Sequence, residues 1–199
     1  ADDATTGRTG GRGGRRATDT MAPRAQPGPV RLLRWDPAGT RARFDTVFTV
    51  SNGIAFSADG ATLYFIESAG RVVFAYDLDP KRGTVTGRRT FAAWAEGVKP
   101  DGVAVDAEGN VWIAIWDGWR VERWSPRGTI QRTIRLPVPR PTSVAFGGHA
   151  LTTLYNPTAR VRLHTAALAP TLVCAALVEH APDWRGRPAG MRARWQSSY

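Results

Sequence analysis

The chain contains the stretch Asn52-Gly-Ile-Ala-Phe-Ser-Ala-Asp-Gly60 and repeats it 49 positions later as Asp101-Gly-Val-Ala-Val-Asp-Ala-Glu-Gly109. Each copy continues into an apolar, aromatic run, and 19 positions separate its first residue from a later arginine, Arg71 or Arg120. This constant spacing predicts one register through three strand-like segments. A repeat of about 40 to 50 residues with about four short strands is typical of β-propeller blades.

Two incomplete copies flank the complete ones. The stretch Thr142-Ser-Val-Ala-Phe-Gly-Gly148 begins with a threonine at the place of Asn52 and Asp101. Upstream, Val30-Arg-Leu-Leu-Arg-Trp-Asp-Pro-Ala-Gly39 resembles the later stretch Arg120-Val-Glu-Arg-Trp-Ser-Pro-Arg-Gly128. We therefore expect about two full blades, preceded by the back half of an earlier blade and followed by part of a later one.

The side chains inside the repeats alternate as they do in a β-strand. Ile54 and Phe56 flank the small Ala55, which is the period of a pleated strand whose two faces meet different neighbours. No stretch between residues 30 and 158 has a sustained helical period, so the predicted fold is all-β. The aromatic residues of the strands are predicted to pack between blades rather than to stack on a ligand: Trp35, Tyr64, Tyr76, Trp112 and Trp124.

Composition divides the chain into three parts. Residues 1–29 are rich in Gly, Arg and Thr with few large apolar side chains, which predicts a disordered tail. Residues 30–158 form the predicted partial propeller. Residues 159–199 lose the repeat pattern and are expected to be irregular or unrelated, apart from an apolar helix or strand at 168–178.

The overall charge of +10 is spread along the chain, because the three parts have net charges of +2, +4 and +4. A Gly-Gly-Arg-Gly-Gly-Arg-Arg run ends at Arg16, but arginine is enriched everywhere, so nucleic acid is not the expected partner. No apolar run approaches the roughly 20 residues that span a bilayer, so a membrane role is not expected. The absence of a secretory signal and of paired cysteines predicts a cytoplasmic location.

Few side chains in this sequence are suited to catalysis. The chain has no Gly-x-Ser-x-Gly elbow, no phosphate-binding loop and no His-Glu-x-x-His motif. The single Cys174 excludes an internal disulfide, and His149, His164 and His180 are too scattered to suggest a metal cluster. A carboxylate such as Asp101 is then the main candidate for proton transfer. The alternative is that Asn52 and Asp101 cap turns before a strand.

Several motifs, in the right order, resemble the gluconolactonase, regucalcin and senescence marker protein family. They are Val50-Ser-Asn-Gly-Ile-Ala-Phe-Ser-Ala-Asp-Gly60, Lys99-Pro-Asp-Gly-Val-Ala-Val-Asp-Ala-Glu-Gly-Asn110, Val111-Trp-Ile-Ala-Ile-Trp116 and Leu136-Pro-Val-Pro-Arg-Pro-Thr-Ser-Val-Ala-Phe-Gly-Gly148. The resemblance implies a six-bladed propeller that binds one divalent cation and hydrolyses sugar lactones or related esters. It also implies that Asn52 and Asp101 are metal ligands and that Asp101 is the catalytic general base. The implied cation is Ca²⁺, with Zn²⁺, Mg²⁺ or Mn²⁺ as alternatives.

The resemblance covers roughly 130 residues, whereas six blades of about 45 residues need about 270. The family's third ligand, a glutamate from an early blade, has no counterpart that the motifs identify. We therefore expect a fragment, a product of a misread gene, or a chain that needs a partner chain to complete the propeller. Two functions remain open: a metal-dependent lactonase or esterase impaired by the missing half, and a non-catalytic remnant or protein-interaction module.

Overall fold

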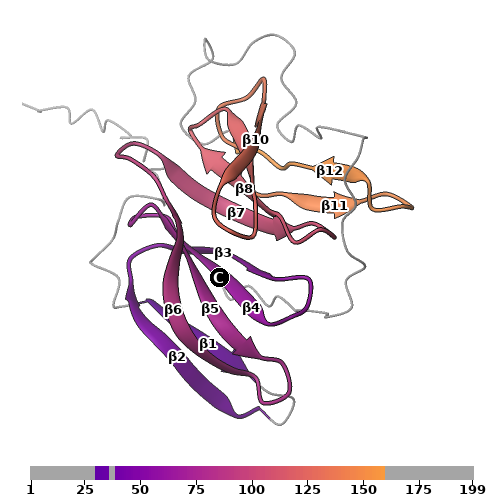
Figure 1. The fold of residues 1–199 in the computed structure, drawn as a ribbon. Coiled ribbons are helices and arrows are strands. Elements are labelled where there is room, and N and C mark those ends of the chain that lie inside the picture. The colour runs from indigo at the N-terminus through magenta and orange to yellow at the C-terminus, as the bar shows by residue number, and fades with distance from the viewer. Residues whose placement is uncertain (1–29, 36–38, 160–199) are drawn as a thin grey trace, which may run out of the picture.

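The computed structural model describes residues 30–35 and 39–159, and within these ranges every regular element is a β-strand (Figure 1). Two four-stranded antiparallel sheets lie between two hairpins, and the four sheets follow one another in chain order. Strand β3 lies against β7, and β7 lies against β11. This is the predicted all-β architecture of successive propeller blades.

The first hairpin joins β1 (Val30–Trp35) to β2 (Arg41–Phe48). The first complete blade, called blade A here, contains β3 (Ser51–Phe56), β4 (Thr62–Glu67), β5 (Val72–Asp79) and β6 (Thr84–Ala93). Blade B contains β7 (Lys99–Val105), β8 (Val111–Trp116), β9 (Arg120–Trp124) and β10 (Ile130–Arg135). The last hairpin joins β11 (Ala145–Gly147) to β12 (Thr153–Tyr155).

The apolar cores lie between the blades rather than within them. Along β8, Ile113 points into the core shared with blade A, whereas its neighbour Trp112 points into the core shared with the last hairpin. Along β4, Tyr64 faces blade B and Leu63 faces the first hairpin. Strands buried on both faces read as continuous apolar runs, which is why these two second strands are the most hydrophobic of each repeat.

The constant register predicted through the repeat is wrong at one turn. Ile54 and Val103 are equivalent in the first strands, but they pair with Phe65 and Ile113, which are 48 rather than 49 positions apart. The turn after β3 is one residue longer, because the backbone N–H of Ser57 bonds to the carbonyl of Thr62 whereas that of Asp106 bonds to Asn110. Arg71 is therefore equivalent to Trp119, and both have positive φ, 57° and 54°.

The aromatic residues follow the prediction in four of five positions. Tyr64, Tyr76, Trp112 and Trp124 are buried in cores between blades. Trp35 is 61% exposed, so its predicted packing is wrong within the described residues. It lies on the face of β1 that points away from blade A, where no described element covers it.

Several other sequence predictions concern single residues or the chain ends. His149 is exposed, as expected for a surface residue. Cys174, His164, His180 and the apolar segment 168–178 lie outside the described residues, as do the predicted tail 1–29 and all of the predicted C-terminal segment beyond residue 159. No helix in the described part of the chain is long and apolar enough to cross a membrane.

Candidate functional site

The first strands of three successive blades begin side by side. Gly53, which follows Asn52, lies so close to β7 that an added Cβ atom would be 2.8 Å from the backbone oxygen of Asp101. Gly102 follows Asp101 in the same way, and an added Cβ there would lie 2.5 Å from the Cα atom of Ser143. The glycines of the Asn-Gly and Asp-Gly pairs are thus required because the backbones of neighbouring blades lie so close together. This close packing brings Asn52, Asp101 and Thr142 to one end of the inner strands.

Asn52 bonds to residues outside its own turn. Its Nδ2 donates to the hydroxyl of Ser68 at 3.2 Å, and its side chain also donates to the carboxylate of Asp101. The Ser68 hydroxyl in turn donates to the carbonyl of Pro100 at 2.6 Å. Since both Asn52 and Asp101 lie inside strands β3 and β7 and bond across the blade boundary, the turn-capping alternative does not describe them.

Asp101 is a half-buried carboxylate with little compensation for its charge. Burial raises the pKa of Asp101 to about 6, and the hydrogen bond from Asn52 opposes this rise only in part. Removal from water disfavours the charged form, and the structure gives no cation within salt-bridge distance of Asp101 among the described residues. The group is thus ionised at neutral pH but is a stronger base than an ordinary aspartate.

A cavity of about 410 Å³ opens at this end of the strands. Its lining is mixed, with polar side chains from Ser51, Asn52, Thr142 and Ser143 and apolar ones from Ile54 and Val103. Asn156 supports one wall, because its buried Nδ2 donates to the backbone carbonyl of Ser143 at 2.7 Å. The cavity has room for a small polar ligand beside Asn52 and its hydrogen-bonded partner Asp101.

A second cavity, of about 480 Å³, lies at the opposite end of β3, after the turn that begins at Ser57. Its charged lining residues include Asp59, Arg89 and Arg127, all exposed. Arg89 is already paired with Asp77 at 2.6 Å. The buried Tyr64 also lines it, and burial raises the pKa of this phenol, so Tyr64 stays neutral. No buried carboxylate is among its described lining residues, so the smaller cavity beside Asn52 is the better candidate site.

Two supporting residues were not identified from the sequence. Glu67 is buried and accepts hydrogen bonds from the backbone N–H groups of Val50, at 2.7 Å, and of Gly70, so it fixes the chain just before Asn52. Ser68 links Asn52 to blade B. The equivalent positions in blade B are Ile115 and Trp116, so the repeat pattern itself contained no signal for either residue.

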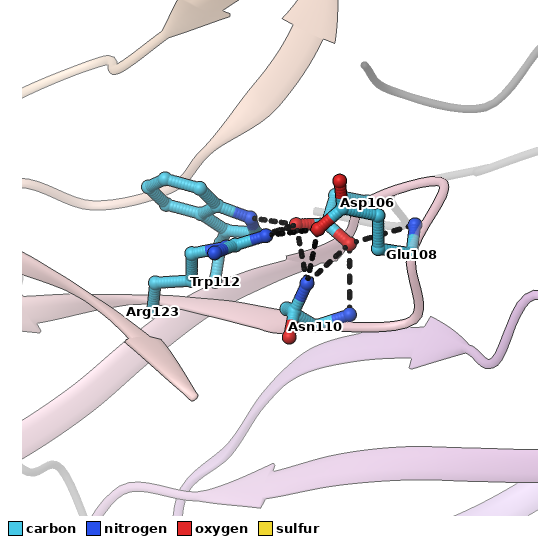
Figure 2. A network of polar contacts seen from close by, with 5 residues as sticks. All are labelled: Asp106, Glu108, Asn110, Trp112 and Arg123. Atoms are coloured by element: carbon cyan, nitrogen blue, oxygen red, sulfur yellow. Dashed lines mark hydrogen bonds and ion pairs between the residues drawn. The ribbon is translucent and has the colours of Figure 1, made fainter. Parts of the chain in front are cut away.

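The opposite end of β7 contains a second carboxylate with very different surroundings. Asp106 is 1% exposed and lies at the centre of a polar network with Glu108, Asn110, Trp112 and Arg123 (Figure 2). It accepts the indole N–H of Trp112 at 3.0 Å and the backbone N–H of Asn110 at 2.8 Å, and it pairs with Arg123 at 3.1 Å. Every side of this carboxylate faces a donor, so the network closes the turn and leaves no ligand position.

A family model described as the SMP-30/gluconolactonase/LRE-like region matches residues 7–160, a wider range than the motifs span. This chain belongs to the SMP-30/gluconolactonase/LRE-like family. Pentonolactonase XacC of Haloferax volcanii is 38% identical over 131 residues, which are 65% of this chain and 45% of that protein. The 6-deoxy-6-sulfogluconolactonase of Pseudomonas putida is 45% identical over 113 residues, 56% of this chain and 38% of that protein.

Solved structures of the SMP-30 family match the described fold. The calcium-binding protein regucalcin of Agrobacterium tumefaciens has a TM-score of 0.69 at 27% identity, covering 75% of this chain and 51% of that one. A luciferin-regenerating enzyme has a TM-score of 0.68 at 27% identity, covering 79% and 53%. These neighbours have six-bladed propellers, so the prediction of a partial six-bladed propeller is confirmed. The chain spans less than half the length of the curated lactonases it matches.

The donor set at Asn52 and Asp101 fits a divalent cation in part. An amide oxygen and a carboxylate are the hard oxygen ligands that such ions take, and among the described residues Asp101 has no cationic partner. Within the described residues no group of three His, Cys, Asp or Glu side chains is close enough to hold a metal ion. The described residues thus offer two donors, and further ligands must come from elsewhere.

Proposed function

We propose that this chain provides the metal-binding and catalytic strands of a divalent-cation-dependent hydrolase of sugar lactones or related esters. The observation that supports it most is the hydrogen bond from Asn52, which lines a cavity, to the half-buried and under-compensated Asp101. Membership of the family supports it as well, since relatives include proteins named as a pentonolactonase and a 6-deoxy-6-sulfogluconolactonase.

Asp101 would act as the general base. Without a cation, a pKa of about 6 leaves the Asp101 carboxylate ionised at pH 7.5 and makes it a stronger base than an exposed aspartate. Its role is to take the proton of the water that attacks the lactone carbonyl. Asn52 donates to Asp101 and so holds the carboxylate in one orientation, while Ser68 fixes the amide of Asn52.

Asn52 and Asp101 are also the residues that would hold the cation, with Ca²⁺ as the first choice and Zn²⁺, Mg²⁺ or Mn²⁺ as alternatives. When bound, a divalent cation supplies Lewis-acid polarisation of the lactone carbonyl. The hydroxyl groups of Ser51, Thr142 and Ser143 line the same cavity and are suited to bind the hydroxyl groups of a sugar lactone.

The test is hydrolysis of glucono-δ-lactone and of an aryl ester by the full 199-residue chain, with each cation added in turn. Asp101→Asn keeps the size of the side chain but removes the base, so we expect a loss of at least about 100-fold in kcat/KM. The matched control is Glu96→Gln, which neutralises an exposed carboxylate on the loop before β7. Wild-type turnover indistinguishable from that of Asp101→Asn would refute the assignment of the base.

The second candidate is a non-catalytic interaction module. The observation in its favour is the uncovered aromatic face of β1, where Trp35 is 61% exposed. This candidate predicts that the chain opens no lactone above the buffer rate with any of the four cations. Calorimetric titration with the same cations then distinguishes loss of cation binding from loss of hydrolysis alone. A chain that binds a cation but hydrolyses no lactone retains the Asn52–Asp101 site and lacks only the catalytic step.

A further inference from the structure

The cavity of about 480 Å³ lies between blades A and B, and its described lining residues all belong to these two complete blades and their turns. On the side of blade A, Tyr64, Ala75 and Arg89 form one row across the sheet, because Tyr64 pairs with Ala75 and Ala75 pairs with Arg89. Directly paired residues of antiparallel strands present their side chains on the same face. The small alanine in the middle of the row leaves space between a phenol and a guanidinium.

Blade B has the same row, but there it is filled. Trp112 is equivalent to Tyr64, because each pairs with an alanine of the first strand. Arg123 pairs with Trp112 and so occupies the position of Ala75. Its guanidinium lies 5.7 Å from the ring centre of Trp112 and pairs with Asp106 at 3.1 Å. The cavity of blade A thus exists because an alanine stands in place of an arginine in the middle of the row.

The hydroxyl of Tyr64 has no hydrogen-bond partner within the described part of the chain. In blade B the indole N–H of Trp112 bonds to Asp106, but Ser57 takes the place of this aspartate in blade A. Tyr64 is only 4% exposed, and because its hydroxyl oxygen is not fully enclosed by protein, it opens into the cavity. Burial raises the pKa of Tyr64, so the hydroxyl remains protonated. It is a donor at the cavity wall that a ligand can satisfy.

Two guanidinium groups belong to the same lining. Arg89 bonds to Asp77 and to the carbonyl of Gly87 through Nη1 alone, and its Nε and Nη2 have no partner among the described residues. Arg127 has no ion pair in the described part of the chain. The charge of Arg89 opposes the rise in the pKa of Tyr64, so the two groups are close. An anion between them can therefore accept hydrogen bonds from both.

The turn between β9 and β10 holds the backbone of Arg127 against blade A. The backbone N–H of Gly128 bonds to the carbonyl of Ser125 at 2.9 Å, and that of Ser125 bonds to the carbonyl of Thr129 at 2.8 Å. An added Cβ atom at Gly128 would lie 2.7 Å from the carbonyl oxygen of Phe91, so this turn lies directly against β6. The cavity is thus preformed by two blades in fixed contact.

The charges and the apolar surface of the lining define a class of ligand. Arg89 and Arg127 are cationic and Asp59 is anionic, so the lining suits one negative charge better than the nearly two charges of a phosphate monoester. The carboxylate of Asp59 is an acceptor for hydroxyl groups of a ligand. The ring of Phe91 is half-buried and offers an apolar surface to its carbon chain.

We propose that this cavity binds a small hydroxy acid, a molecule with one carboxylate and several hydroxyl groups. The carboxylate accepts from the Tyr64 hydroxyl and from the unpaired N–H groups of Arg89, and Arg127 adds a second positive charge. The hydroxyl groups of the ligand donate to Asp59, and its carbon chain lies against Phe91.

This site is distinct from the candidate catalytic cavity, which lies at the other end of β3 and shares no lining residue with it. A lactone opens to a molecule of the proposed class. Binding is measured without turnover, however, so the inference stands apart from the proposed hydrolase activity.

The first experiment is calorimetric titration of the full 199-residue chain with gluconate in metal-free buffer of low ionic strength. We expect one-to-one binding with a dissociation constant of about 1 mM or lower. Glucose has hydroxyl groups without a carboxylate, and acetate has a carboxylate without hydroxyl groups, so each should bind at least about tenfold more weakly. No saturable binding of gluconate, or equal binding of acetate or inorganic phosphate, would overturn the proposal.

A substitution of Tyr64 tests the contact at the cavity wall. Tyr64→Phe removes one oxygen and keeps the ring in the core, so we expect gluconate to bind about tenfold more weakly. Because the hydroxyl has no described partner, the stability of the free chain should not fall. The matched control is Tyr155→Phe, which removes the hydroxyl of a half-buried tyrosine outside the cavity. Unchanged gluconate binding by Tyr64→Phe, or an equal loss in the control, would refute the assignment.

Two further variants test the charge and the location. Arg127→Gln changes an exposed residue of a turn, so the variant keeps its fold, and we expect at least about tenfold weaker binding. Its control is Arg135→Gln, at an exposed arginine at the end of β10. Asp101→Asn should bind gluconate as wild type does. A loss with Asp101→Asn but not with Tyr64→Phe would place gluconate in the candidate catalytic cavity and overturn the inference, whereas absence of lactone hydrolysis would leave it intact.

Discussion

The two ends of strand β7 hold carboxylates in opposite circumstances. Asp106, directly after the end of β7 that leads to β8, is 1% exposed and accepts hydrogen bonds from Asn110, Trp112, Arg123 and the backbone N–H of Glu108. Asp101, five residues earlier, is half-buried and has one described side-chain donor, Asn52. A carboxylate saturated with donors serves the fold, whereas an under-compensated one can gain by binding a cation or taking a proton.

Replacement of the saturated carboxylate should have the largest effect on stability. Asp106→Ala leaves the buried indole N–H of Trp112 and the guanidinium of Arg123 without their acceptor, which costs about 3 to 5 kcal/mol. Urea denaturation of the full chain, followed by tryptophan fluorescence, measures this loss.

The matched control for this substitution is Glu108→Gln in the same network. Its carboxylate also contacts Arg123, at 2.6 Å, but its side chain is 64% exposed, so its removal should cost less than about 0.5 kcal/mol. If both substitutions destabilised the chain equally, the distinction between a central and a peripheral acceptor would be lost.

The sequence predicted the position of Asp101 but not the polar network around Asp106. The repeat places Asn52, Asp101 and Thr142 at one blade position, and the alternation of small and large side chains predicts the strands that hold them. The alternation of side chains along a strand predicts the face of the sheet on which a residue lies. This is enough to predict that Trp112 and Trp124 pack between blades. The same reasoning misplaced Trp35, because the pattern of one strand does not reveal whether a neighbouring blade is present.

Other features depend on contacts that no local pattern contains. The extra residue in the turn after β3 breaks the spacing that Arg71 and Arg120 suggested, because a turn can lengthen by one residue without changing the strands on either side. Ser68 reaches Asn52 and Pro100 only in the folded chain. The pKa of Asp101 likewise results from its burial, which follows from how closely the blades approach.

A substitution at Gly102 tests how closely the blades approach each other at the Asp101 end of β7. Gly102→Ala places a Cβ atom 2.5 Å from the Cα atom of Ser143, a backbone clash that only separation of β7 from the segment before β11 relieves. We expect a loss of about 2 to 3 kcal/mol in urea denaturation. The control is Gly97→Asn, at a position with open space around it, because asparagine tolerates a φ of 86° better than other side chains, so its loss reports backbone strain without a clash. A Gly102→Ala protein as stable as wild type would show that the inner strands are not in close contact.

The ionisation of Asp101 should make its end of β7 sensitive to pH. Its folded pKa, about 6, lies above the ordinary value near 4, so the folded state binds the proton more tightly and stability falls as pH rises from about 4 to 6. In metal-free buffer Asp101→Asn lacks this term. It should therefore match wild type near pH 4 and exceed it by about 1 kcal/mol at pH 7.5, a figure reduced because water reaches the half-buried group. A stability difference that does not change with pH would contradict an under-compensated Asp101.

The smallest effect is expected at the turn of blade A that corresponds to the Asp106 network. Ser57 occupies the place of Asp106, and its hydroxyl donates to Asp59 at 2.5 Å and accepts the backbone N–H of Thr62 at 2.8 Å. These groups lie near the surface, and water can replace the hydroxyl, so Ser57→Ala should cost about 0.5 to 1 kcal/mol in the same urea experiment. A loss as large as that of Asp106→Ala would mean that any polar side chain at this position of a blade stabilises its turn equally. A small loss would mean that the stabilisation depends on the number of buried hydrogen-bond donors around the side chain, which is larger for Asp106 than for Ser57.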